Sequence, residues 1–469
     1  MRSGYVKALS ILAAAVGALR RLPLEGAIRL AVPVTVVAVA LGSNWSPSVR
    51  QVAQPLWKLL LALLCALAVA FALAHVGPRR LWESARSPAY ALAAALVALA
   101  AASILWSADP RLTVERVASF SLVLVAAAAL GLAAAGDRPL VERLLVAVAA
   151  GPVAVAVLGV VVLAVTPHHA LQEATKTIPV RYRGIGQNPN TVPMLFAATL
   201  PLLTWLALEW RGRRRAAAIV GLVLLAASIV GSGSRGALVT GAAGCLLVTV
   251  ATATSARGRL LAAAAVAIAL AVAVGLGQIP QPDPAATDTS PTGCLDCKNK
   301  VHDADATMRL EDEFGYPGGA DPGLKRTLFA STGRTQAWEG AVDQGQERPV
   351  VGYGFGTEDR VFVDRYYSFF GGSPENSYVG IFLQLGLAGL VLVLALAAAL
   401  VLAGAAAIRR LDGEARRAAA ACTAVVCAGL VLAVVQSYIY AAGNNATLTV
   451  WLCAFLGLAL AARPAAAST

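Results

Sequence analysis

The stretch "IVGSGSRGALVTGAAG", residues 229–244, places one arginine, Arg235, between two apolar runs. Residues 214–231 before it and 236–254 after it are rich in Ala, Val and Leu, and each approaches the ~20 residues that a helix needs to cross a bilayer. A turn of Gly and Ser between two such runs predicts two membrane-spanning helices joined tightly. This pattern decides the fold class: an all-α polytopic membrane protein.

The rest of the chain repeats this pattern. Of its 469 residues 58% are hydrophobic and 14% are charged, whereas soluble domains carry roughly 25% charged residues. We predict about twelve transmembrane helices from runs long enough to cross a membrane. They cover 24–43, 55–76, 88–106, 114–135, 140–166, 190–210, 214–231, 236–254, 259–277, 377–407, 415–441 and 446–463.

These runs divide the chain into three predicted parts. Residues 1–277 hold spans one to nine, and residues 377–469 hold spans ten to twelve. Between spans nine and ten, residues 278–376 form one long exterior loop, in which the periodicity around Trp338 predicts a short helix.

Arginines cluster in the loops between spans and set the predicted orientation. With twelve spans these clusters all fall on one side, which the positive-inside rule makes cytoplasmic, together with both termini. The net charge of +12 therefore reflects membrane topology, and nucleic acid is excluded as a partner. The clusters are Arg20 and Arg21; Arg79, Arg80 and Arg86; Arg211 and Arg213 to Arg215; Arg257 and Arg259; and Arg409, Arg410, Arg416 and Arg417.

The opposite, exterior face collects the polar residues that are able to do chemistry. Each arginine on this face has a simpler reading, in which its charged head reaches into the membrane interface. A guanidinium also matches phosphate bidentately, and an ionisable residue at membrane depth is a candidate functional residue. Several such arginines in an apolar protein predict a phosphorylated lipid substrate. They are Arg181, Arg183, Arg235, Arg326 and Arg334.

Two polar groups accompany these arginines. Asn188 and Asn190 precede span six, where they either cap the helix or bind sugar hydroxyls. Glu375, Asn376 and Tyr378 precede span ten. They either cap that helix or provide a carboxylate base that takes a proton from an alcohol.

Seven cysteines are present. Five lie in the apolar runs and are predicted to be buried packing residues. Cys294 and Cys297 form a "CLDC" motif in the exterior loop. Such a motif is a redox pair, half of a zinc site or a local disulfide, and an oxidising exterior favours the disulfide. We expect no metal site, since no second pair stands at zinc-site spacing.

Three motifs in order resemble the superfamily of O-antigen ligases and Wzy-type polymerases. They are "RGIGQNPN" at 183–190, "GSGSRGA" at 231–237, and a set comprising "GRTQAWEGA" at 333–341, "RPVVGYGFGTE" at 348–358 and "ENSYVGIFLQLGLAGL" at 375–390. The resemblance covers about residues 100 to 460. It implies a transferase similar to the GT-C class, which moves a glycan from an undecaprenyl-diphosphate donor without a metal or other cofactor and with inversion.

The resemblance also implies roles for single residues. Arg235 and Arg334 match arginines that hold the donor diphosphate, and Arg183 matches the arginine before the Asn-Pro-Asn stretch. Asn376 and Tyr378 match an "HNSY"-like motif, in which Glu375 stands where ligases commonly carry a His. We therefore predict Glu375, Arg235 and Arg334 as catalytic residues. The predicted substrate-binding residues are Arg183, Asn188, Asn190, Arg326, Asn376 and Tyr378.

The resemblance places the protein in the bacterial inner (cytoplasmic) membrane, with its active site on the periplasmic side. Its expected partners are a lipid-linked glycan donor, a glycan or glycolipid acceptor, and membrane lipids. Ligase and polymerase activities remain alternatives. A transporter is disfavoured, because carriers usually show repeat symmetry and polar residues near the bilayer midplane, whereas here the polar residues gather on one face.

Overall fold

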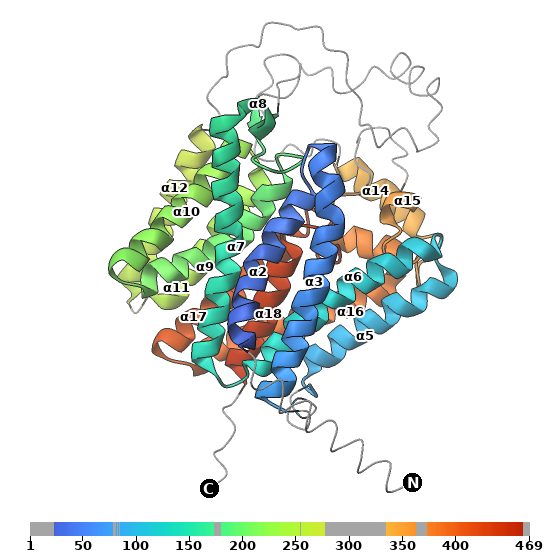
Figure 1. The fold of residues 1–469 in the computed structure, drawn as a ribbon, viewed down its shortest axis with the longest axis horizontal. Coiled ribbons are helices and arrows are strands. Elements are labelled where there is room, and N and C mark those ends of the chain that lie inside the picture. The colour runs from blue at the N-terminus through green and yellow to red at the C-terminus, as the bar shows by residue number, and fades with distance from the viewer. Residues whose placement is uncertain are drawn as a thin grey trace, which may run out of the picture.

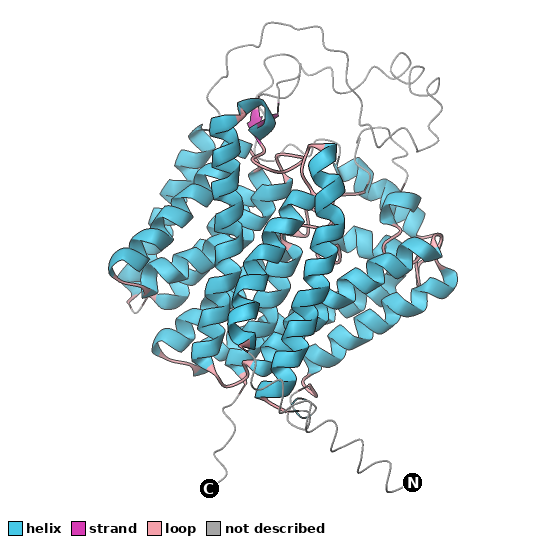
Figure 2. Cartoon of the chain, in the orientation of Figure 1, coloured by secondary structure: helices cyan, strands magenta, loops and turns pink. Residues whose placement is uncertain are grey.

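The computed structural model describes residues 23–77, 81, 83, 85–172, 180–253, 255–276, 334–362 and 373–462. In these ranges the regular structure is helical apart from one antiparallel pair of two-residue strands, β1 (Leu171–Gln172) and β2 (Arg181–Tyr182) (Figures 1 and 2). The helices are α2 (Leu24–Gly42), α3 (Pro47–His75), α5 (Pro88–Ala102) followed by the 3-10 turn η1 (Ser103–Trp106), α6 (Pro110–Ala133), α7 (Arg138–Val165), α8 (Pro167–Ala170), α9 (Thr191–Glu209), α10 (Gly212–Ser232), α11 (Arg235–Thr252), α12 (Ala256–Leu276), α14 (Arg334–Gly345), α15 (Glu358–Val361), α16 (Ser377–Arg410), α17 (Gly413–Leu432) and α18 (Thr447–Ala461).

Local sequence explains where several helices begin. Asp109 and Asp137 precede α6 and α7, and their carboxylates accept hydrogen bonds from the backbone N–H of Leu112 and Leu140, both at 3.0 Å. A side-chain acceptor at this position satisfies one of the free N–H groups of the first turn. Proline follows at the first or second position of α3, α5, α6 and α7, where its missing N–H costs nothing.

The polytopic all-helical fold is confirmed, whereas the expected twelve spans are not all shown. Among the described residues, ten helices are long and apolar enough to cross a membrane. Helices α12 and α18 occupy the ninth and twelfth predicted spans, but neither is among the ten. With 15 residues, α18 extends only ~22 Å at ~1.5 Å per residue, which is less than the ~30 Å hydrocarbon core. Twelve spans are therefore not established.

The prediction for the eleventh span, residues 415–441, was wrong at its C-terminal end. Helix α17 ends at Leu432, and residues 433–446 run in turns before α18. The start of α16 holds this segment in place: Ser377 N donates to Ala433 O at 2.7 Å, and Ser377 Oγ donates to Gln436 O at 2.6 Å. These contacts turn the polar residues of the segment inward, so composition alone misplaced the helix end.

Helix α9 lies inside the bundle. It packs against α10, α11 and α17, and its side chains from Val192 to Leu206 are all buried. Helices α2 and α3 pack on each other, α2 also packs on α7, and α3 also packs on α6 (Figure 1). The predicted short helix in the long loop is present as α14, which packs against α16.

The two ends of the bundle differ in chemistry. At one end, ion pairs join loops and helix ends, including Arg143 with Glu25 at 2.5 Å and Arg417 with Glu209 at 2.5 Å. The second pair confirms that the basic loops at 211–215 and 409–417 share an end. The other end holds the α10–α11 turn, the strands and α14 (Figure 1), and it contains the predicted site residues that the structure describes.

Candidate functional site

An ion pair between Arg334 and Glu375 forms the centre of the candidate site. Arg334 begins α14 and Glu375 precedes α16, and the guanidinium approaches Glu375 Oε2 at 2.8 Å from Nε and 2.5 Å from Nη2. The two side chains are 20% and 22% exposed. Trp338 Nε1 donates to Pro374 O at 2.8 Å and fixes α14 against this segment. The pair is therefore held in place while remaining partly open to a ligand.

The backbone at Glu375 is strained. Its φ is +48°, which makes it the one non-glycine residue with positive φ in the described ranges. Such a conformation costs on the order of 1–3 kcal/mol and persists where the surroundings impose it, often at active sites. The next residue is fixed in place: Asn376 Oδ1 caps α16 by accepting from Tyr378 N at 2.9 Å and Val379 N at 3.1 Å.

Gln436 completes this group, and the sequence analysis missed it. Its amide Nε2 donates to Glu375 Oε2 at 3.5 Å. Within the described residues, the hydrogen bonds to Glu375 all end on Oε2. The sequence offered a clue to Gln436: the polar pair Gln436-Ser437 lies inside the predicted span 415–441, and polar residues within a span are candidate functional residues.

Arg181 connects the loop before α9 to the α10–α11 turn through hydrogen bonds. This side chain is buried, at 7% exposed. Its Nε donates to Ser232 O at 2.6 Å, and its Nη2 donates to Asn190 Oδ1 at 2.8 Å. Arg181 therefore joins two of the predicted motifs. Asn190 serves here as its partner, and its side chain does not cap α9.

Arg235 is the first residue of α11, directly after the turn that Gly233 makes at φ +61°. The turn packs on the segment that carries Gln436, since a Cβ at Gly236 would lie 3.0 Å from Val435 Cγ2. A chain of contacts thus runs from Arg181 through the turn and the 435–436 segment to Glu375. This chain places Arg235 at the same end of the bundle as the Arg334–Glu375 pair.

Three predicted substrate-binding residues have clear structural roles. Arg183 donates from Nε to His169 O and from Nη2 to His168 O, each at 3.1 Å, and lies 4.6 Å from the centroid of the Trp45 ring. Asn188 orders the loop before α9, and Tyr378 of α16 binds α17. Asn188 Oδ1 accepts from Asn190 N at 2.8 Å, and Tyr378 donates its hydroxyl to Leu430 O at 2.9 Å.

The remaining predictions divide between described and undescribed parts of the chain. Arg326, Cys294 and Cys297 lie outside the described residues. The burial expected for the cysteines in the helices is confirmed for Cys65, Cys422 and Cys453, whereas Cys245 and Cys427 are half-buried.

Comparison with known families gives one match. Residues 220–394 match a family model, Wzy_C, described as O-antigen ligase. The matched range contains Arg235, Arg334 and Glu375, and it ends within α16. The chain matches none of the curated proteins with which it was compared.

Proposed function

We propose, from the match of residues 220–394 to the O-antigen ligase model, that this chain transfers a glycan from an undecaprenyl-diphosphate donor to an acceptor hydroxyl on the outer face of the bacterial cytoplasmic membrane. The family match supports a multi-pass membrane enzyme of polysaccharide biosynthesis. The observation that supports the finer proposal is the Arg334–Glu375 pair, held by α14 and α16 inside the matched range.

The arginines act on the donor in this proposal. As the bond from the anomeric carbon to the diphosphate oxygen breaks, negative charge grows on the leaving undecaprenyl diphosphate. Guanidinium groups placed beforehand at that position stabilise the charge without reorganising. Arg334 is held by a carboxylate and is partly exposed, so a diphosphate can join or replace that partner. Arg235, at the turn before α11, supplies the second positive charge.

Glu375 acts on the acceptor. The acceptor oxygen forms its bond to the anomeric carbon from the face opposite the leaving group, which inverts the configuration, and the hydroxyl proton passes to the carboxylate. Arg334 and Gln436 both donate hydrogen bonds to Oε2 of Glu375. In this mechanism they orient the carboxylate so that Oε1 takes the proton.

Two alternatives remain to be distinguished by the product. A polymerase of the Wzy type uses a second lipid-linked glycan as acceptor, and a ligase uses a different glycolipid such as lipid A–core. A transporter would move the donor across the membrane without glycosyl transfer. We favour transfer because the matched O-antigen ligase range contains the partly exposed Arg334–Glu375 pair.

The test is reconstitution of the full-length protein in liposomes with an undecaprenyl-diphosphate oligosaccharide and, separately, each acceptor. Released undecaprenyl diphosphate measures turnover, and product mass distinguishes ligation from polymerisation. We expect Arg334→Ala to lower the rate ~100- to 1000-fold, as for loss of one group that stabilises developing charge. Glu375→Gln should lower it ~100-fold, as for loss of a general base.

Glu339→Gln is the matched control, because it removes an exposed carboxylate from the same helix, α14. It should leave turnover unchanged. Full turnover in Arg334→Ala would refute the assignment of this arginine. Donor crossing the membrane without any transfer would refute the enzyme mechanism and favour a transporter.

A further inference from the structure

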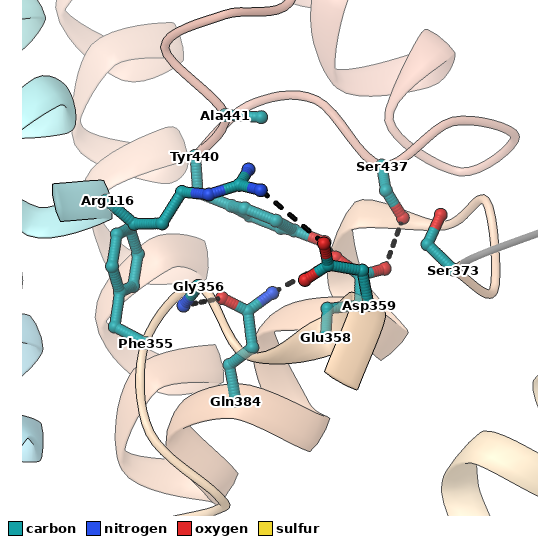
Figure 3. A pocket seen from close by; sticks show the side chains of 10 residues that line it. All are labelled: Arg116, Phe355, Gly356, Glu358, Asp359, Ser373, Gln384, Ser437, Tyr440 and Ala441. Carbon is teal, nitrogen blue, oxygen red and sulfur yellow. Dashed lines mark hydrogen bonds and ion pairs between the residues drawn. The ribbon is translucent and has the colours of Figure 1, made fainter. Parts of the chain in front are cut away.

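A cavity of about 270 Å³ lies at the same end of the bundle as the Arg334–Glu375 pair. Its walls come from α6, the loop before α15, α15 itself, α16 and the segment between α17 and α18 (Figure 3). The residues that line it are Arg116, Phe355, Gly356, Glu358, Asp359, Ser373, Gln384, Ser437, Tyr440 and Ala441.

Glu358 is the central polar group of this cavity. Its side chain is 6% exposed, and it accepts hydrogen bonds from Ser437 Oγ at 2.6 Å, from Gln384 Nε2 at 3.1 Å and from the Tyr440 hydroxyl. Gly356 N donates to Gln384 Oε1 at 2.7 Å, which turns the amide nitrogen toward Glu358 (Figure 3). Helix α16 and the segment between α17 and α18 therefore converge on one buried carboxyl group of α15.

Two glycines make room for this cluster. A Cβ at Gly380 would lie 2.8 Å from Glu358 Oε1 and would overlap the Tyr440 hydroxyl. Gly356 adopts φ +79°, and a Cβ there would overlap the side chain of Arg116. Both positions exclude a side chain, which keeps the wall of the cavity free for polar groups.

The cavity is connected to Glu375 through the segment between α17 and α18. Ser437 Oγ accepts from Asn376 N at 3.1 Å and donates to Glu358. The preceding residue, Gln436, binds Glu375. The cavity and the Arg334–Glu375 pair therefore lie on two sides of one dipeptide, so a group in the cavity is a close neighbour of the pair.

We propose that this cavity is a carbohydrate subsite, which binds one neutral sugar ring of the glycan substrates; the proposal rests on the proposed function. Its polar groups are a carboxyl, an amide and hydroxyls, which suit neighbouring sugar hydroxyl groups. The rings of Phe355 and Tyr440, with centroids 6.3 Å apart, form the apolar part of the cavity wall, against which the C–H face of a sugar would pack. The volume is at the small end of ligand pockets and suits a single ring.

Other ligand classes fit this cavity less well. Two carboxyl groups, Glu358 and Asp359, line it and oppose an anion, and Arg116 is paired with Asp359 at 3.5 Å. A divalent cation needs several oxygen ligands, and within the described residues no group of three or more His, Cys, Asp or Glu side chains is placed to hold one. The cavity therefore favours a neutral polyhydroxyl ligand.

The test is saturation-transfer NMR on the full-length protein in nanodiscs with a panel of neutral methyl glycosides. We expect at least one glycoside to bind wild type, and Glu358→Gln to weaken that binding up to about tenfold, as for loss of one hydrogen bond. Ala441→Leu should abolish binding by filling the cavity without changing charge. Melting curves in the same nanodiscs confirm that each variant is folded.

Two controls separate this inference from the proposed function. Arg334→Lys should lose glycan transfer and still bind the glycoside, and Glu339→Gln should bind as wild type does. If no neutral glycoside binds wild type, or if folded Ala441→Leu binds it equally well, the subsite is refuted whatever the result for transfer. If glycoside binding depends on the cavity and transfer is absent, only the proposed reaction is refuted.

Discussion

Two regions at the same end of the bundle use their charged residues in different ways. In the loop between α7 and α9, Arg181 and Arg183 donate to the backbone carbonyl oxygens of Ser232, His169 and His168, and Arg181 also donates to Asn190 Oδ1. In the region formed by α14, α15, the start of α16 and the segment 433–446, two ionisable groups are, among the described residues, bound by side chains alone. Arg334 binds Glu375 there, and Glu358 accepts from Ser437, Gln384 and Tyr440.

This difference distinguishes structural from functional charge. A guanidinium that satisfies backbone carbonyls cannot leave them without exposing buried acceptors, so it behaves as part of the fold. A charged side chain paired with another side chain can exchange that partner for a substrate when it is partly exposed. The first region therefore positions the turn before Arg235, and the second region is where we expect chemistry.

The largest expected effect concerns Glu358 and tests whether the second region contains a titrating group. Burial raises the pKa of Glu358 from 4.5 to about 7, and the nearby charge of Asp359 adds to this rise. The hydrogen bonds from Ser437 and Tyr440 and the positive charge of Arg116 lower the pKa and offset part of it. Between these two values the folded protein binds a proton that the unfolded chain does not. Stability therefore falls as pH rises through this window, by roughly 3 kcal/mol in total, and levels off above it.

Melting temperatures across this pH window measure the effect. Wild type should lose stability toward neutral pH, and Glu358→Gln should lose less, because its side chain does not titrate. The difference between the two curves isolates Glu358 from the other carboxyl groups. Parallel curves would mean that Glu358 keeps an ordinary pKa, and the contrast between the regions would be weaker.

The next effect tests whether strain at Glu375 serves function. Glu375→Gly and Glu375→Ala should both lower transfer ~100-fold, because neither has a carboxylate. They should differ in stability: glycine accepts φ +48° freely, whereas alanine retains the strain, so the glycine variant should be more stable by ~1 kcal/mol. Parallel turnover and melting measurements check both statements. Equal stability would show that the positive φ is not costly in this setting.

The sequence predicted the helices more reliably than the contacts of the site. Apolar runs revealed the polytopic fold because bilayer thickness demands a minimum length of each helix. The same argument failed at residues 433–446, where contacts with Ser377 end α17 early. It was also silent about Glu358, because a buried carboxyl at the start of a four-residue helix has no sequence periodicity, and its partners Gln384 and Tyr440 come from distant segments.

The motif resemblance brought out Arg334 and Glu375 as separate candidates, and the structure shows them as a pair. The sequence treated all exterior arginines alike, since nothing in the composition tells a guanidinium bound by carbonyl oxygens from one bound by a carboxylate. That distinction depends on which loops meet, as Arg181 and Ser232 do across 51 positions of the chain.

The smallest expected effects lie within the first region, where Arg181 and Arg183 are one residue apart. Arg181→Ala should destabilise the protein by ~2 kcal/mol, because Ser232 O and Asn190 Oδ1 lose their donor in a buried place. Arg183→Ala should cost less than ~1 kcal/mol, since its contacts with the histidine carbonyls and the Trp45 ring are more exposed. Melting curves measure both.

Transfer assayed below the melting temperature should be nearly unchanged in Arg181→Ala, because its guanidinium binds groups of the protein that hold the fold together. A large loss of transfer without loss of stability would instead make Arg181 a substrate contact, and the two regions would then form one continuous site.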